Sequence, residues 1–155
     1  MIRFYGDQSR KKEIIQTSRW LAEEILGPKI SKEISLSIIL QDMFEEGAFR
    51  KDKRIWGSCL HVSGNKFRFE LSSFLNNTPI KTCATLAHEM THIRQYLTGD
   101  LYFYPSISFI RWKGRRYSAD IENASNRDEY YKIPWEKEAM DAEEVFRKRY
   151  SQLHR

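Results

Sequence analysis

The segment between Thr78 and Gly99 constrains this chain most, because it has helix signals at both ends and two histidines inside. Thr78 can cap a helix whose first position is Pro79, and Gly99 stands where that helix would end. The sequence therefore predicts one helix over residues 79–98. Its apolar positions recur at helical spacing and are Ile80, Ala84, Leu86, Ala87, Met90, Ile93 and Leu97.

His88 and His92 are four positions apart on this predicted helix, so their imidazoles project from one face. They can share one metal ion, and Glu89 can reach a water on the metal rather than the metal itself. Zinc lowers the pKa of such a water toward about 7 and polarises a carbonyl group, while a carboxylate takes up the proton. The pattern favours Zn²⁺-dependent hydrolysis with Glu89 as the catalytic base. Two ordinary helix histidines are the alternative.

A catalytic zinc ion needs a third protein ligand beside two histidines. The extended pattern HExxHxxGxxH has glycine and histidine where this chain has Gln95 and Thr98, so that ligand set is excluded. A carboxylate on the last predicted helix, which Pro134 opens, is the better candidate. Glu138 is favoured because it lies inside the helix rather than in its first turn. Glu136 is the alternative and lies about 200° away around the axis.

Two segments resemble the compact HExxH zincins that use a glutamate as third ligand: residues 88–92 (HEMTH) and 134–139 (PWEKEA). The second segment is similar to the Glu-Ala helix of ImmA/IrrE-like peptidases and of small bacterial and phage metallopeptidases. The resemblance implies a zincin-like metallopeptidase domain of the α+β class, with Zn²⁺ bound by His88, His92 and Glu138. It also implies a peptide or protein substrate.

Two further features of this resemblance are weaker. An aspartate orients a ligating histidine in larger glutamate zincins, and Asp141 is the candidate here, although its position after Glu138 differs from theirs by one residue. Residues 112–117 (WKGRRY) are similar to a strand of SprT-like proteins, which use a third histidine that this chain lacks. A nucleic-acid-associated SprT-like protein is therefore an alternative.

A donor that stabilises the oxyanion of the reaction would complete the site. Tyr130 and Tyr131 precede the last predicted helix, and Tyr117 and Arg116 lie between the two helices, so all four are candidates. A peptide substrate can bind by adding a strand to an exposed sheet edge. Residues 66–72 are the candidate edge, because they come directly before the metal-binding helix.

The rest of the chain predicts a small, mainly antiparallel sheet with helices before and after it. Apolar periodicity after Gly6 predicts an N-terminal helix that ends at Gly27 and Pro28. Alternating segments predict strands, and the last two of them form a hairpin around a Ser-Gly-Asn turn. The segments are strands at 33–41, 55–62 and 66–71, an interrupted apolar stretch at 101–112, a loop at 120–131 and a final helix from Pro134.

Length and composition predict one zincin-like domain over residues 1–155, since 155 residues suffice for a single core. Lys and Arg exceed Asp and Glu by five, and they occur in short scattered groups. This surface allows weak association with nucleic acid but indicates no specific recognition. The chain shows neither a signal peptide nor a membrane span, so we expect a protein of the cytoplasm.

The two cysteines, Cys59 and Cys83, form no CxxC pair, which argues against a thiolate zinc site and fits a reducing compartment. A non-catalytic zinc-binding module is a further alternative. A structural zinc ion normally has four protein ligands, and the sequence offers three convincing ones. The open fourth position favours catalysis.

Overall fold

The computed structural model describes residues 1–41, 57–73, 78–104, 109–122 and 127–154. Helices and strands both occur within these ranges, which confirms the predicted α+β class. The α-helices are α1 (Lys11–Leu26), α2 (Pro28–Glu33), α3 (Pro79–Leu97), α4 (Arg127–Tyr131) and α5 (Pro134–Leu153), with single 3₁₀ turns at Gln8–Arg10 and Ala119–Glu122. The strands are β1 (Ile2–Tyr5), β2 (Ser35–Gln41), β3 (Gly57–Ser63), β4 (Lys66–Ser72), β5 (Leu101–Tyr104), β6 (Phe109–Trp112) and β7 (Arg115–Ser118).

The larger sheet has the order β1-β2-β4-β3 and corrects the expectation of mainly antiparallel pairing. β1 pairs with β2 and β2 with β4 in parallel, and only β3 runs antiparallel to β4. The reason is the crossover: α1 and α2 return the chain to the end of the sheet where β1 began, and parallel strands need such a connection. β1 itself was not expected from the sequence.

The position of β4 contradicts the prediction that residues 66–72 form a sheet edge. β4 lies between β2 and β3, so its backbone is paired on both sides. The strand at this edge is β3, which the β3–β4 hairpin places there. The predicted strand at 55–62 is described from Gly57 onward, and residues 55 and 56 lie outside the described ranges.

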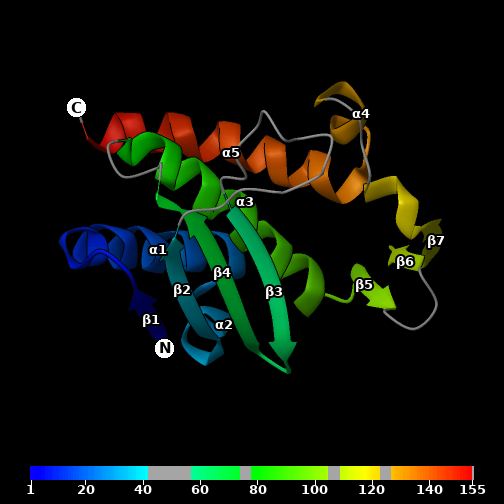
Figure 1. The fold of residues 1–155 in the computed structure, drawn as a ribbon, viewed down its shortest axis with the longest axis horizontal. Coiled ribbons are helices and arrows are strands. Elements are labelled where there is room, and N and C mark those ends of the chain that lie inside the picture. Colours follow the sequence, from blue (N-terminus) through cyan, green and yellow to red (C-terminus); the bar gives the residue numbers. More distant parts are fainter. Residues whose placement is uncertain (42–56, 74–77, 105–108, 123–126, 155) are drawn as a thin grey trace.

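One face of this sheet is covered by α1 and α3, and α5 packs on α3 from the other side (Figure 1). The alternation in β2 and β4 produces this layer, since every second side chain points to the helices. α1 contributes Ile14 and Leu21, which are completely buried. The sheet contributes Leu36, Ile38, Leu40, Phe67, Phe69 and Leu71, and α3 contributes Cys83, Leu86, Ala87, Met90 and Ile93.

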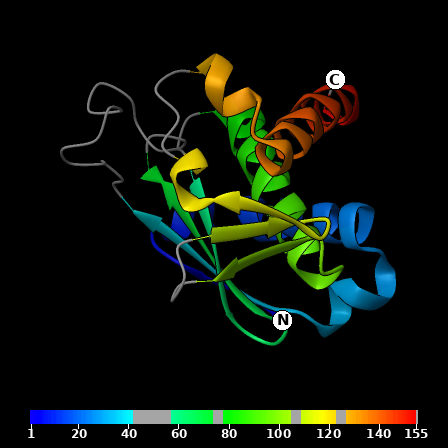
Figure 2. The same ribbon diagram turned by 90° about the vertical axis from the view of Figure 1, so that its right-hand side faces the viewer.

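The second sheet is an antiparallel meander of β5, β6 and β7 beyond the C-terminal end of α3 (Figure 2). Its inner side chains pack with the start of α5 in a separate cluster built from Leu101, Ile110, Trp112, Ile133 and Trp135. The apolar stretch predicted at 101–112 is therefore two strands, and its residues 105–108 are not described. The predicted loop at 120–131 contains a 3₁₀ turn and α4, because Glu122 and Tyr130 are anchored beside Trp135 and Glu136.

Helix boundaries follow the signals in the sequence. The Asp7 side chain accepts a hydrogen bond from the Ser9 amide (3.0 Å) and opens the turn before α1. Gly27 ends α1 with a φ of 89°, a value that favours glycine. Within the described residues, no helix combines the length and the apolar character that crossing a membrane requires.

Candidate metal centre

Helix α3 carries His88 and His92 on one face, as the sequence predicts. It runs from Pro79 to Leu97, and the two imidazole rings lie 4.9 Å apart between centroids. His88 is buried at 8% relative exposure, and the side chain of His92 is only 12% exposed. Both rings therefore stand in a protected place where a bound ion would be held away from bulk solvent.

Glu136, in the first turn of α5, completes a group that could hold a metal ion. Its Oε1 atom lies 2.6 Å from Nε2 of His92 and 3.6 Å from Nε2 of His88. One ligand atom from each of the three residues lies within 4.8 Å of the other two. This is the one such group of three or more His, Cys, Asp or Glu residues among the residues that the structure describes.

The preference for Glu138 as the third ligand is corrected by this geometry. Glu138 points along another side of α5, where its Oε1 accepts hydrogen bonds from Arg94 (2.8 Å) and Gln95 (3.2 Å). The Arg94 partner explains why this carboxylate turns away from the histidines. Burial alone would raise the pKa of Glu138, but the hydrogen bonds from Arg94 and Gln95 together with the Arg94 charge outweigh burial and lower it. The structure brings Glu136, the alternative residue, to His88 and His92.

The outer nitrogens of the two rings are held by side chains that the sequence did not single out. Nδ1 of His88 lies 2.6 Å from Oε1 of Glu143, and Nδ1 of His92 lies 2.8 Å from Oε1 of Gln95. Gln95 is oriented in turn, because its Nε2 donates to the Trp135 carbonyl (3.0 Å) and to Glu138. Both contacts place an acceptor at Nδ1, which favours the tautomer with a proton there and leaves Nε2 for a metal.

Asp141 does not have the predicted role of orienting a histidine. Its carboxylate accepts hydrogen bonds from Tyr131 (2.7 Å) and Lys137 (2.8 Å) at the surface of α5. It lies five positions after Glu136, which is about 140° around a helix, so it faces away from the histidines. Glu143 occupies the orienting position instead.

The candidates for oxyanion stabilisation are separated by the structure. Tyr130 lines the cavity at the site, and its hydroxyl donates to Oε2 of Glu136. Tyr131 is bound to Asp141, and Tyr117 packs edge-to-face on Trp135, so neither faces the histidines. Arg116 lies over the Phe109 ring on the outer face of the small sheet.

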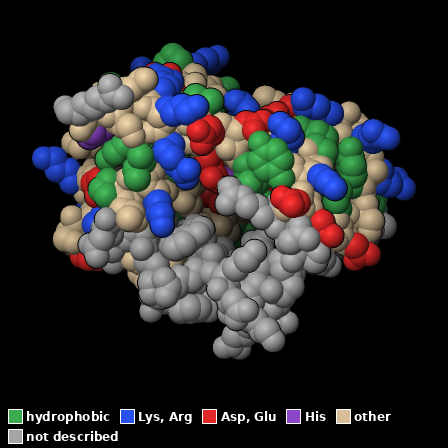
Figure 3. Space-filling view, turned by 90° about the horizontal axis from the view of Figure 1, so that it is seen from above, with side chains coloured by type: hydrophobic (Ala, Val, Ile, Leu, Met, Phe, Trp, Pro, Cys, Tyr) green, Lys and Arg blue, Asp and Glu red, His purple; other side chains and the backbone are tan. Residues whose placement is uncertain are grey.

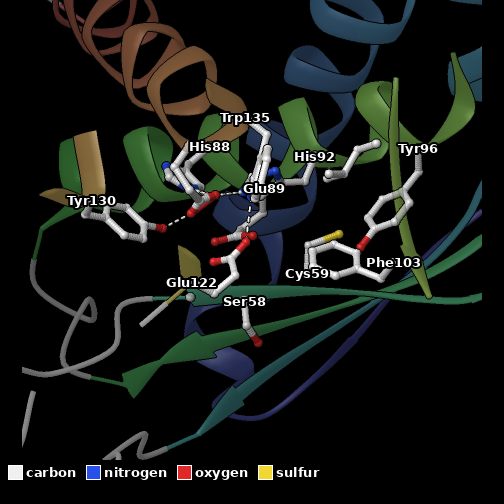
Figure 4. A pocket seen from close by; sticks show the side chains of 13 residues that line it. Ser58, Cys59, His88, Glu89, His92, Tyr96, Phe103, Glu122, Tyr130 and Trp135 are labelled. Atoms are coloured by element: carbon white, nitrogen blue, oxygen red, sulfur yellow. Dashed lines mark hydrogen bonds and ion pairs between the residues drawn. The ribbon is translucent and has the colours of Figure 1, made fainter. Parts of the chain in front are cut away.

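A cavity of about 300 Å³ opens between α3, β3 and the start of α5. Figure 4 shows the side chains of α3 pointing into it, with β3 passing along the other side. Gly57 permits this approach, since a methyl group there would come 2.7 Å from Thr85 of α3. The lining consists of Gly57, Ser58, Cys59, His88, Glu89, His92, Tyr96, Leu101, Phe103, Glu122, Tyr130, Trp135 and Glu136.

Burial and charge shift the pKa values in the cavity in different directions. Burial raises the pKa of Glu89 although both histidines oppose this, so Glu89 is a stronger proton acceptor than an exposed glutamate. Burial opposes ionisation of Glu136 too, but His92 and His88 outweigh it and hold the pKa of Glu136 below its ordinary range. Burial would lower the pKa values of His88 and His92, and Glu136 raises both above 6.5 with help from Glu143 at His88.

Several residues of the site escaped the sequence analysis. Glu143 carried a usable signal, because seven positions after Glu136 is two helical turns and the same face of α5. Gln95 carried one as well, three positions after His92 on the same helix. Tyr96 carried one too, since it lies four positions after His92 on α3, whereas Glu122 and Cys59 reach the cavity from distant segments and no local pattern distinguishes them.

Charged side chains of both signs lie on the described part of the face that is seen from above. Seen from above, Lys and Arg side chains are spread over the face around acidic side chains near its middle (Figure 3).

No family model matches this chain, and neither a curated protein nor a solved structure does. The assignment of function therefore depends on the geometry of the site.

Proposed function

We propose that this chain is a zinc-dependent peptidase in which His88, His92 and Glu136 bind the metal and Glu89 is the general base. One observation carries the proposal: Glu89 shares a cavity with a group of three ligand atoms that lie within 4.8 Å of one another. The cavity also borders β3, the edge strand of the larger sheet. A base, a metal group and a strand edge together are what hydrolysis of an extended peptide needs.

The ligand set fits zinc. Two imidazoles and one carboxylate form the protein part of a known type of catalytic zinc site, in which a fourth position stays open. Cys59 and Glu122 line the same cavity but do not belong to the group of ligand atoms. Three protein ligands among the described residues support catalysis over the four-ligand structural site of a binding module.

The Nδ1 contacts support the same ligand set. Because Glu143 and Gln95 occupy Nδ1 of His88 and His92, the Nε2 atoms are the ones that face Glu136. Orienting contacts of this kind fix the ring and increase the basicity of a ligating histidine.

Glu89 has the position and the pKa of a general base. When bound, zinc would lower the pKa of a water molecule in the open position and polarise the carbonyl of the substrate. Glu89 then takes the proton and delivers it to the leaving amine. Glu89 is 5% exposed, and this burial raises its pKa, which increases its affinity for that proton.

An extended peptide would lie along β3. Among the described strands, this strand pairs only with β4, and three of its residues, Gly57, Ser58 and Cys59, line the cavity. A peptide that adds a strand here would place its backbone between β3 and the catalytic group. Tyr130, which donates to Glu136, stands on the other side of the cavity and is the candidate to stabilise charge on the peptide carbonyl.

The test is the variant Glu89→Gln, assayed with a quenched fluorescent peptide library in the presence of zinc. We expect it to retain bound zinc and to lose cleavage by at least about a hundredfold, since general base catalysis contributes about 10²–10⁴. Asp141→Asn is the matched control, because it removes a carboxylate of α5 that contacts Tyr131 and Lys137 and lies outside the ligand group. If Glu89→Gln cleaves as fast as the natural chain, the proposed mechanism is wrong.

A further inference from the structure

The outer face of the small sheet carries a continuous group of rings and guanidinium groups. We name it the ring–arginine face and define it by Tyr102, Tyr104, Phe109, Arg111 and Arg116. These residues share one face because β5, β6 and β7 alternate, and the opposite side chains form the cluster around Trp135. Strand register places them in adjacent rows, with Tyr102 opposite Arg111, Arg111 opposite Arg116 and Tyr104 opposite Phe109.

Rings and guanidinium groups of the ring–arginine face contact one another, and the Tyr102 and Tyr104 rings lie 4.4 Å apart with a tilt of 58°. The guanidinium carbon of Arg111 lies 5.7 Å from the centre of the Tyr102 ring and 5.8 Å from that of Tyr104. Arg116 lies 4.2 Å from the centre of the Phe109 ring, and the Tyr104 and Phe109 rings stack at 4.4 Å with an angle of 26°. Planar groups thus form a platform on the surface, where Tyr102 is 47% exposed.

The charge of this face is positive, and among the described residues its arginines form no ion pair. β5, β6 and β7 have no acidic residue, and their arginines are Arg111 and Arg116 on this face and Arg115, which is opposite Trp112, on the other face. Arginine–aromatic stacking elsewhere in the chain differs: Arg149 lies over Trp20 and Phe146 and is also paired with Glu24 at 3.0 Å.

We propose that the ring–arginine face binds single-stranded nucleic acid. Unpaired bases stack on aromatic rings and guanidinium planes, and the arginine charges neutralise the adjoining phosphates. A duplex hides the faces of its bases and so cannot use the rings. An acidic peptide would pair with the arginines but has no need of three neighbouring rings.

Strand β5 joins this face to the cavity. Leu101 and Phe103 line the cavity, while Tyr102 and Tyr104 belong to the ring–arginine face. A nucleic-acid strand bound on the outer face would therefore be separated from the cavity of the metal site by β5. The proposal is independent of catalysis, since binding to this face needs neither the metal nor Glu89.

The test is fluorescence anisotropy of a labelled oligothymidine with the full chain at low salt. We expect saturable binding that weakens steeply with salt, as release of counterions requires. Tyr102→Ala and the double variant Arg111→Ala with Arg116→Ala should each weaken binding by about fivefold or more, the low end of the effect of losing one stacked base. A circular dichroism melt of each variant checks that the fold is kept.

The matched control is Arg149→Ala, which removes a stacked arginine from a site where a carboxylate already neutralises it. We expect its affinity for the oligonucleotide to equal that of the natural chain. An equal loss in this control would show that binding depends on net charge alone, and would overturn the proposal. Equal affinity for a duplex of the same length, stronger binding of a polyglutamate peptide or of anionic vesicles, or no binding at low salt would also overturn it.

Discussion

The cavity and the ring–arginine face lie on opposite sides of β5, and they differ in the burial and the partners of their charged side chains. In the cavity, Glu136 is 5% exposed and is held by two histidines and a tyrosine. On the outer face, Arg111 and Arg116 are exposed and contact only rings among the interactions described. Charges fixed by buried partners suit a metal and a reaction, whereas exposed stacked charges suit a ligand that comes and goes.

The largest difference in stability between the two regions should come from a substitution of Trp135. It is 1% exposed, contacts Trp112 and Tyr117, and donates to Glu122 at 2.6 Å. We expect Trp135→Ala to reduce the free energy of unfolding by about 3–5 kcal/mol, because it leaves a large cavity. Urea denaturation followed by circular dichroism measures this change.

Tyr102→Ala on the outer face of the same sheet is the comparison for that measurement. We expect a change within about 0.5 kcal/mol, since the side chain is half exposed. Equal losses of stability in Trp135→Ala and Tyr102→Ala would contradict the distinction between a packed inner face and a ligand-binding outer face.

Removal of an orienting side chain should weaken zinc binding without abolishing it. We expect Gln95→Leu and Glu143→Ala each to lower zinc affinity by about 10–100-fold, the usual effect of losing such a contact. Competition with a chromophoric chelator measures the affinity. Glu143→Gln should recover most of it, since its amide oxygen still accepts from His88; failure of this rescue would point to the charge rather than the hydrogen bond.

The pKa shifts predict that zinc affinity and the stability of the metal-free protein change with pH in opposite directions. The pKa values of His88 and His92 are raised above 6.5, so protons compete with zinc already above that pH, and zinc affinity falls as the pH decreases. In metal-free protein, the raised pKa values contribute stability below the unfolded pKa, which is lost as the pH rises through the folded values. Chelator competition measures zinc affinity against pH, and urea denaturation measures the stability of metal-free protein against pH. If zinc affinity and stability changed with pH in the same direction, protons and zinc would not share the two histidines.

Asp141→Asn should have the smallest effect. Asp141 is exposed at the surface, where its partners are Tyr131 and Lys137, and such pairs contribute little. We expect neither zinc affinity nor the midpoint of unfolding to change measurably. A large loss of zinc in this variant would restore the orienting role that the sequence suggested for Asp141.

Helix α3 could be predicted from the sequence because all its signals are local. Thr78, Pro79 and Gly99 bound α3 within one residue of its observed ends, and the spacing of His88 and His92 determines their common face. The third ligand could not be chosen in this way. Whether Glu136 or Glu138 faces the histidines depends on the rotation of α5 against α3, which is fixed by long-range contacts such as that of Gln95 with Trp135.

For the larger sheet too, local patterns in the sequence were not enough to predict the pairing of strands. Alternation in β2 and β4 reveals which side chains are inside, but the register and direction of pairing depend on segments far apart in the chain. β1 has only four residues with an incomplete alternation, so its parallel pairing with β2 left no clear local signal. The edge position of β3 follows from the pairing of β2 with β4, which makes β4 an inner strand, and so does the proposed path of the substrate.

The central claim is that Glu136 completes the metal site, and direct zinc analysis tests it best. Purified natural chain, Glu136→Ala and Glu138→Ala are each dialysed against equimolar zinc and analysed by mass spectrometry of the metal. We expect zinc to be retained by the natural chain and by Glu138→Ala and to be lost from Glu136→Ala. Retention by Glu136→Ala, with loss from Glu138→Ala, would contradict the site described here.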